Sequence, residues 1–195
     1  MDLQRINIKL YLEDEESISS EDAFRIFNTW IPVTTDETLI DVADYSHLPF
    51  GPQTLLVGHE ANYSLDNTDG RMGLMYARKR PVAGTCAERI SDALAKTLRA
   101  CVRLEEEAEL EDRVRFSASE CWIVINDRLS AANDDATLAA IRPDLESVLG
   151  QLYGQETFEI ERQQVDSARQ RFSVSARVSS QKQHRVSTLL QNIAP

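Results

Sequence analysis

The sequence has no apolar run approaching the ~20 residues that a membrane-spanning helix needs. Its first residues, Met1 to Arg5, lack the apolar segment of a secretory signal peptide. Its three cysteines, Cys86, Cys101 and Cys121, are an odd number without CxxC spacing, which favours reduced thiols over a disulfide framework. We therefore expect a cytoplasmic protein with no membrane segment and with structural, buried cysteines.

Positive charge is also scarce, since 21 basic residues stand against 32 acidic ones and the net charge is −11. This charge opposes attraction to nucleic acids and anionic lipids, which are polyanions, so nucleic acid is not an expected partner. The chain also lacks a P-loop, a dinucleotide-binding fingerprint, an H-E-x-x-H motif and a G-x-S-x-G elbow. These absences favour a non-enzymatic protein, although they leave enzymatic activity open.

The charge that is present is unevenly distributed. Residues 70–80 contain four basic and no acidic residues, and residues 160–195 contain six basic and two acidic residues. These two basic islands lie in an otherwise acidic chain. Opposite charges on one surface allow two subunits to meet, and a basic island also suits an anionic ligand.

Hydrophobic periodicity predicts an α+β protein. Residues 6–12 alternate between apolar and polar, as in a half-buried strand. Further strands are predicted at 38–45, 53–59, 70–80, 157–163 and 171–178, with a hairpin formed by 114–116 and 121–125. Helices are predicted from Ser19 or Ser20 to Pro32, over 85–112, and from an Asn133 cap with a break at Pro143.

This order predicts a mixed, largely antiparallel sheet of six to eight strands, with one long and two or three shorter helices packed on it. Residues 1–178 are expected to form a single domain, and residues 179–195 a tail with a short amphipathic helix. The helical stripe of that tail docks either on its own sheet or on a partner subunit; its residues are Val186, Leu189, Leu190 and Ile193. The acidic run 105–112 should fray, project into solvent or meet a basic partner, because acids are unfavourable at a helix C-terminus.

The most plausible position for a ligand site is the stretch from Asp41 to Arg80. Five of the seven glycines lie between Gly51 and Gly84. Glycine serves positions where the backbone needs positive φ or close approach. The polar run 59–71 is expected to be a loop between strands, and such loops often carry function.

Anion binding is one interpretation of this stretch. Arg71 and Arg78 belong to a cationic cluster, and Arg71 lies in the glycine-flanked segment Gly70–Gly73. Guanidinium groups and loop N–H groups bind phosphate or carboxylate through charge-assisted hydrogen bonds. The candidate ligand-binding residues are Arg71, Arg78, Asn62, Gly70 and Gly73. The alternative is that Asp69-Gly70 forms a plain hairpin turn and that the basic residues pair with acids elsewhere.

A divalent metal is a second interpretation. Asp44 and His47 are close in sequence, and His59-Glu60 follows a predicted strand. Carboxylate and imidazole ligands suit zinc, iron or manganese, which could activate water. The candidate metal ligands are therefore Asp44, His47, His59 and Glu60. The alternative places His47 in a turn before Pro49 and hydrogen-bonds His59 to a loop.

The sequence does not identify a function. The leading hypothesis is a non-enzymatic binding or assembly protein that forms a homo-oligomer or binds another protein. The alternatives are a metal-dependent hydrolase using the residues 41–60, and a protein that binds a phosphate or carboxylate ligand.

Overall fold

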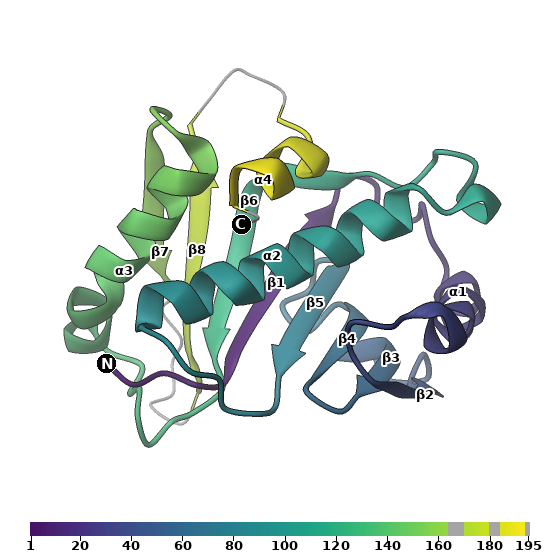
Figure 1. The fold of residues 1–195 in the computed structure, drawn as a ribbon, viewed down its shortest axis with the longest axis horizontal. Coiled ribbons are helices and arrows are strands. Elements are labelled where there is room, and N and C mark those ends of the chain that lie inside the picture. The colour runs from purple at the N-terminus through teal and green to yellow at the C-terminus, as the bar shows by residue number, and fades with distance from the viewer. Residues whose placement is uncertain (164–169, 180–183, 194–195) are drawn as a thin grey trace.

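A computed structural model describes residues 1–163, 170–179 and 184–193 and shows one sheet with helices against it (Figure 1). The strands are β1 (Ile6–Leu12), β2 (Leu39–Asp44), β3 (Pro52–Gly58), β4 (Ala61–Asp66), β5 (Gly73–Arg78), β6 (Phe116–Ile125), β7 (Phe158–Arg162) and β8 (Phe172–Val178). The helices are α1 (Ser20–Val33), α2 (Cys86–Glu105), α3 (Asp135–Tyr153) and α4 (Val186–Ile193), with a 3-10 turn, η1 (Ala108–Leu110). The strand order is β2-β3-β4-β5-β1-β6-β8-β7, and each neighbouring pair is antiparallel. The predicted α+β class and strand number are confirmed.

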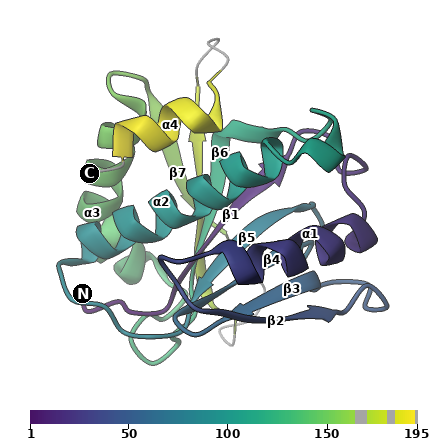
Figure 2. The ribbon, with the colours of Figure 1, turned by 45° about the vertical axis from the view of Figure 1, so that its right-hand side comes forward.

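The four helices lie on the same side of the sheet (Figure 2). Helix α2 crosses the middle and contacts β1 and β5, while α1 contacts β2 and β3, α3 contacts β7, and α4 contacts β6. None of the described helices covers the opposite face, which we call the open face. Within the described residues, no helix has the length and apolarity required to cross a bilayer.

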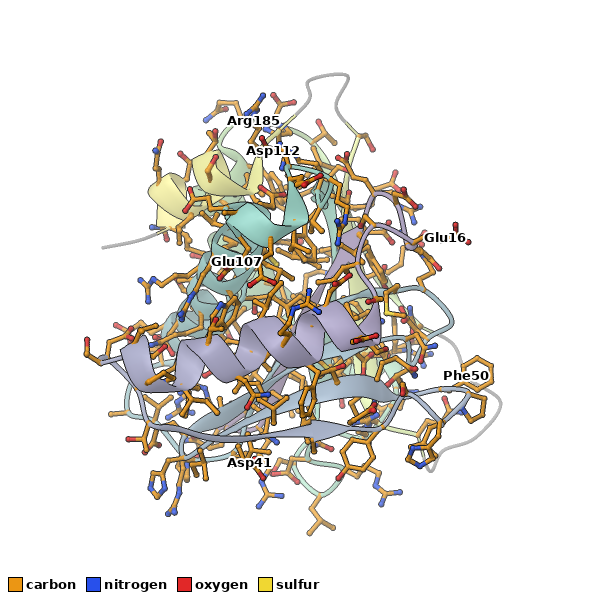
Figure 3. The ribbon with its side chains drawn as sticks, turned by 90° about the vertical axis from the view of Figure 1, so that its right-hand side faces the viewer. Glu16, Asp41, Phe50, Glu107, Asp112 and Arg185 are labelled. Carbon is orange, nitrogen blue, oxygen red and sulfur yellow. The ribbon has the colours of Figure 1, made fainter. Side chains whose placement is uncertain are left out.

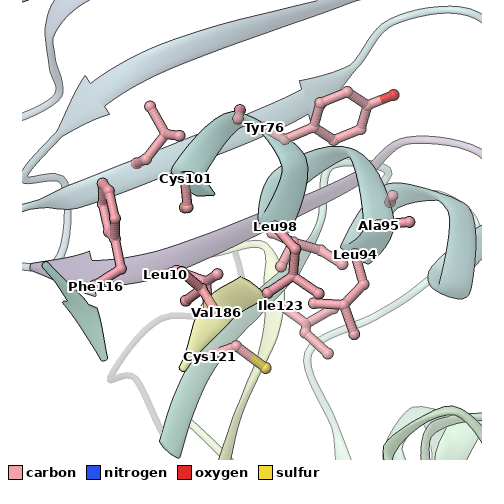
Figure 4. Close-up of a cluster of buried hydrophobic side chains, with 14 of the residues drawn as sticks. Leu10, Tyr76, Leu94, Ala95, Leu98, Cys101, Phe116, Cys121, Ile123 and Val186 are labelled. Carbon is pink, nitrogen blue, oxygen red and sulfur yellow. The ribbon is translucent and has the colours of Figure 1, made fainter. Parts of the chain in front are cut away.

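The main core lies between the sheet and the helices. Successive side chains of a strand point to opposite faces, so Ile6, Ile8 and Leu10 of β1 all face α2. Leu10 and Ile123 of the sheet lie beneath Leu94 and Leu98 of α2 (Figure 4). Burial of this apolar layer holds α2 across the centre of the sheet.

The three cysteines belong to this core, as expected. All three are free and buried. Burial raises the pKa of the Cys86 thiol to about 11 and that of Cys121 to about 12, because the thiolate would lose its hydration. The protonated thiol is a poor nucleophile, so these side chains act in packing.

Helix α2 ends at Glu105, seven residues before the predicted end at residue 112. The Glu105 carboxylate accepts a hydrogen bond from the backbone N–H of Phe116, at 2.8 Å, and Glu111 and Asp112 take positive φ angles of 47° and 58°. These features turn the chain from α2 into β6. The acidic run meets partners within the chain: Glu107 (labelled in Figure 3) accepts a hydrogen bond from the Trp30 indole, and Glu109 pairs with Arg25.

Other local predictions were also wrong. The expected hairpin around residues 117–120 is instead the continuous strand β6. The expected loop 59–71 contains the strand β4, and the expected break at Pro143 is absent because α3 continues through it. The α3 cap is Asp134, whose side chain accepts from the Thr137 N–H, and not Asn133. Helix α1 similarly passes Pro32 by one residue.

The apolar stripe of the C-terminal helix is buried against its own chain. Val186, Leu189 and Ile193 of α4 are buried, and α4 contacts α2 and α3 as well as β6. Of the two alternatives for this stripe, docking within the chain is therefore the one observed. An argument for self-association based on this stripe no longer applies.

Candidate functional site

The open face contains a second layer of buried side chains, although no described helix covers it. On β1, Asn7, Lys9 and Tyr11 point to this face, and all three are buried. Tyr11 packs with Met75, Trp122 and Val124 in a small cluster separate from the main core. The prediction that β1 is half-buried is therefore wrong, because its polar side is as buried as its apolar side.

Lys9 is the centre of this layer, and its side chain is 0% exposed. Its Nζ donates to Asp66 Oδ1 at 3.2 Å, Asp69 Oδ1 at 2.6 Å and the carbonyl of Arg71 at 2.6 Å. An ammonium group has three donors, so these acceptors satisfy it completely. Lys9 thereby ties β1 to the β4–β5 turn that carries Arg71.

Tyr11 is the second anchor of that turn, because its hydroxyl donates to Asp69 Oδ2 at 2.6 Å. Burial and this hydrogen bond raise the pKa of Tyr11 far above its ordinary value. Burial of Asp69 raises the pKa of its carboxyl, but the hydrogen bonds from Lys9 and Tyr11 lower it by more, so the pKa lies below its ordinary value. Both groups are therefore in their hydrogen-bonding forms at neutral pH.

The lowered pKa of Asp69 predicts acid sensitivity. Because the folded pKa lies below the unfolded value of about 3.9, the ionised carboxylate stabilises the fold above pH ~4. That contribution is lost as the pH falls through the folded pKa. In urea titrations from pH 6 to pH 2.5, Asp69→Asn should be less stable than wild type at pH 6 and show a smaller fall in acid. A parallel fall in both proteins would contradict the prediction.

Arg71 extends the network across the open face. Its guanidinium lies 3.7 Å from the centroid of the Tyr11 ring and donates to Glu120 Oε1 at 3.0 Å. Glu120 also accepts from Arg177 at 3.0 Å. Hydrogen bonds and stacking therefore link the β4–β5 turn through β1 and β6 to β8. This arrangement fixes the positions of both guanidinium groups.

Beyond this network, the open face is hollowed into a groove of about 1000 Å³. Its floor includes Trp122 and Val124 of β6, together with Ser173 and Ser175 of β8. We call it the open-face groove. Five arginines and three acids line it: Arg71, Arg128, Arg162, Arg171, Arg177, Asp69, Glu120 and Glu161. Arg162 pairs with Asp135 of α3 at 2.9 Å, so four arginines and three acids remain, and this slight excess of cations contrasts with the net charge of −11 of the chain.

Arginines from both basic islands of the sequence line this groove, although Arg71 is the one residue of the first island among them. Arg71 comes from residues 70–80, whereas Arg162, Arg171 and Arg177 come from residues 160–195. They converge because β1 pairs with both β5 and β6, and β6 pairs with β8. Arginines that are far apart in the sequence therefore lie together in the fold, among the acids Asp69, Glu120 and Glu161.

The floor of the groove also contains a buried donor without an acceptor. Trp122 is only 6% exposed, and its indole Nε1 has no hydrogen-bond partner among the described residues. An unsatisfied buried N–H costs about 1–3 kcal/mol, so such a group needs an explanation. An acceptor from a molecule in the groove would satisfy it once the ring turned, because the Nε1 atom itself is closed to solvent in this structure.

The structure separates the candidate anion-binding residues into two groups. Arg71, Gly70 and Gly73 lie at the β4–β5 turn, at one end of the open-face groove. Asn62 and Arg78 lie at the other end of β4 and β5, where Ala61 is paired with Arg78. Arg78 pairs with Asp92 of α2. Only the first group is close to the groove.

The structure does not assemble the candidate metal ligands either. Asp44 and His47 lie at the β2–β3 loop, and His59 and Glu60 lie at the β3–β4 turn. The seven residues of β3 separate the two pairs by roughly 20 Å. His59 and Glu60 form an exposed pair at 3.6 Å. In the described part of the chain, no group of three or more metal-ligating side chains is placed to hold an ion.

The sequence reasoning missed most of the network, namely Lys9, Tyr11, Glu120, Trp122 and Arg177. A signal for part of it was present, since Arg171, Ser173, Ser175 and Arg177 alternate with the apolar residues of β8. That pattern places four polar residues on one face. It does not reveal which strands lie beside β8.

The chain was compared with family models, curated proteins and solved structures, and none of them matches it. A functional proposal for this protein therefore depends on the geometry of the groove.

Proposed function

We propose that this protein is a binding protein whose open-face groove holds a ligand bearing a carboxylate or phosphate group. The main support is the convergence of Arg71 and Arg177 on one oxygen of Glu120, at 3.0 Å each. The same two guanidinium groups line the groove. Each guanidinium has five N–H donors, so one bond to Glu120 leaves it able to donate to an anion in the groove.

The surroundings make this pair suitable for recognition. The Arg71 side chain is 46% exposed and the Arg177 side chain 61% exposed, so a ligand can reach both. Their positions are set in advance by the Tyr11 ring and by Glu120, which lowers the entropy that a ligand must overcome. Glu120 also keeps the two cations together when no ligand is bound.

Anion binding should depend on both arginines. In calorimetric titrations with citrate and with inorganic phosphate at low ionic strength, Arg71→Ala and Arg177→Ala should each weaken binding about tenfold or more. A charge-assisted hydrogen bond contributes ~1.5–3 kcal/mol, and 1.4 kcal/mol is a factor of ten. Added salt should weaken binding further.

Arg99→Ala is the matched control, because Arg99 is an exposed arginine of α2, on the helical side, whose ion pair with Asp36 is 4.0 Å long. It should bind both anions as wild type does. Equal loss in all three variants would indicate a general charge effect, and absence of binding by the wild-type protein would refute the proposal.

Self-association and metal-dependent hydrolysis remain predictions of the sequence. The apolar stripe of α4 no longer supports self-association, because it is buried within the chain. The hydrolase alternative requires its candidate metal ligands to lie close together, and β3 separates them into two pairs. The described geometry favours neither of them over anion binding.

A further inference from the structure

Building on the proposed anion-binding function, we infer that the ligand is an extended acidic peptide segment, with two acidic side chains that reach the two ends of the open-face groove. The inference comes from the spacing of charge along β8 and Arg171, the residue just before it. Arg171, Ser173, Ser175 and Arg177 all line the groove. Alternate residues of a strand share a face, so the two arginines flank the two serines on one surface.

The distance between the charged ends sets the length of the ligand. Arg171 and Arg177 are six positions apart, or roughly 20 Å at ~3.3 Å per residue. Arg71 adds a second guanidinium at the Arg177 end of the groove, because both arginines donate to Glu120. Arg128 lines the Arg171 end, since it follows β6 where Ile125 pairs with Phe172. A ligand that bridges both ends therefore needs two anionic groups roughly 20 Å apart.

The middle of the groove suits a peptide backbone. Its floor contains the buried Trp122 Nε1 donor, which lacks a described partner, and the hydroxyl of Ser173, whereas the Ser175 hydroxyl already donates to Glu120 at 3.4 Å. Peptide carbonyls are neutral acceptors that would satisfy such donors. An aliphatic chain would leave the indole N–H unsatisfied, at a cost of about 1–3 kcal/mol.

Two features argue against a single-stranded nucleic acid in the same groove. Bases bind proteins by stacking on exposed aromatic faces, whereas the Trp122 ring is almost wholly buried. The groove also contains the acids Glu120 and Glu161, and the whole chain carries a net charge of −11. A phosphate at every nucleotide would meet this repulsion, while a peptide with two separated acids would meet it only at the groove ends.

The test uses three seven-residue peptides of alanine and serine with blocked termini. The first has glutamate at positions one and seven, the second has both glutamates adjacent at one end, and the third has them at positions one and four. In an extended peptide, positions one and seven face the same side and positions one and four face opposite sides. We expect the first peptide to bind at least tenfold more tightly than the other two in calorimetric titrations.

Variants of the protein identify the two ends. Arg171→Ala and Arg177→Ala should each weaken binding of the first peptide about tenfold, while Arg171→Ala leaves citrate and inorganic phosphate binding nearly unchanged. Trp122→Phe keeps an aromatic ring in place but removes the N–H donor. It should weaken binding of the first peptide about fivefold, which is within the range of one neutral hydrogen bond. Arg99→Ala should leave peptide binding unchanged.

The outcomes separate this inference from the proposed function. Equal affinity for the three peptides, with citrate binding still dependent on Arg71 and Arg177, would overturn the peptide inference and leave the anion site intact. Failure of citrate, phosphate and every peptide would overturn both. Tighter binding of a seven-nucleotide oligothymidylate than of the first peptide would also overturn it, in favour of a nucleic acid.

Discussion

Replacing Lys9 with methionine is expected to lower the free energy of unfolding by about 3–5 kcal/mol, the usual cost of removing one partner of a buried ion pair. Lys9 is fully buried and forms ion pairs with Asp66 and Asp69. The Asp66 side chain is only 3% exposed, so water cannot take the place of the ammonium group. Methionine retains most of the packing volume, so the loss would report charge and hydrogen bonding. Urea unfolding at neutral pH measures it.

Lys96→Met is the matched control for this prediction. Lys96 lies on α2 and pairs at 3.6 Å with Asp36, whose side chain is 60% exposed. A surface pair of this kind contributes about 0–1 kcal/mol, so the control should unfold nearly as wild type does. Similar losses in both variants would show that the buried cluster is not a major source of stability.

A double-mutant cycle assigns the cost to the carboxylates. If Lys9 stabilises the fold mainly by neutralising Asp66 and Asp69, Lys9→Met should lower the free energy of unfolding much less in a protein that already carries Asp66→Asn and Asp69→Asn. The same cluster holds the turn that carries Arg71, through the hydrogen bond from Lys9 to the Arg71 carbonyl. Lys9→Met should therefore also weaken citrate binding, although Lys9 itself is buried.

The buried state of Lys9 could not be predicted from the sequence. Residues 6–12 alternate between apolar and polar, and this pattern normally places the polar side in water. What buries Lys9 is its neighbours: β1 lies between β5 and β6, and its carboxylate partners are 57 and 60 residues away. Strand order is a non-local property that periodicity does not contain.

The strand β4 is a different case, because the sequence did contain the signal for it. Ala61, Tyr63 and Leu65 alternate with Asn62, Ser64 and Asp66, which is the period of a strand. The high polar content of residues 59–71 led to the prediction of a loop. The hydrogen-bonding and ion-pair partners of Asp66 within the fold compensate for the polarity of this strand.

The boundaries of α2 and β6 show why local patterns fail near their ends. The apolar stripe of α2 predicts its position, but Glu105 ends the helix through a hydrogen bond to the backbone of Phe116. Residues 117–120 have the composition of a turn, yet Glu120 lies within β6 because it pairs with Arg177 of β8, and Arg71 and Arg177 bind its carboxylate. In both places a partner distant in sequence determines the local structure.

The candidate site was predicted only in part for the same reason. Arg71 was selected for its charge and its flanking glycines, and the structure places it at one end of the open-face groove. The second basic island was visible in the composition, but its proximity to Arg71 depends on the pairing of β6 with both β1 and β8. One-dimensional charge patterns can therefore identify the components of such a surface without revealing their assembly.

Gly73→Ala is the second substitution for which we expect a large effect, a loss of about 2–3 kcal/mol of unfolding free energy. A Cβ at this position would lie 2.3 Å from the Leu10 carbonyl oxygen and 3.0 Å from the Leu10 carbonyl carbon. These atoms belong to the backbone of β1, so no side-chain rotation can relieve the clash. The strands β1 and β5 would have to separate locally, and overpacking of this kind costs about 1–3 kcal/mol.

Gly150→Ala provides the matched control, because a Cβ there would have no atom within 4 Å and the residue lies within α3. Alanine is favoured over glycine inside a helix by about 0.5–1 kcal/mol, so this variant should be as stable as wild type or slightly more so. The two variants make the same chemical change, and thermal or urea unfolding compares them directly. A stable Gly73→Ala protein would mean that β1 and β5 tolerate a wider spacing.

The functional consequence of Gly73→Ala follows from its position. Gly73 pairs with Tyr11, and the Tyr11 ring supports the Arg71 guanidinium at 3.7 Å. A shift of β5 away from β1 would move Arg71 relative to Glu120 and Arg177, which are held by β6 and β8. Under conditions where the variant is still folded, we therefore expect citrate binding to weaken about tenfold, as in Arg71→Ala. Unchanged binding by a destabilised variant would show that the two guanidinium groups keep their spacing without the close contact of β1 and β5.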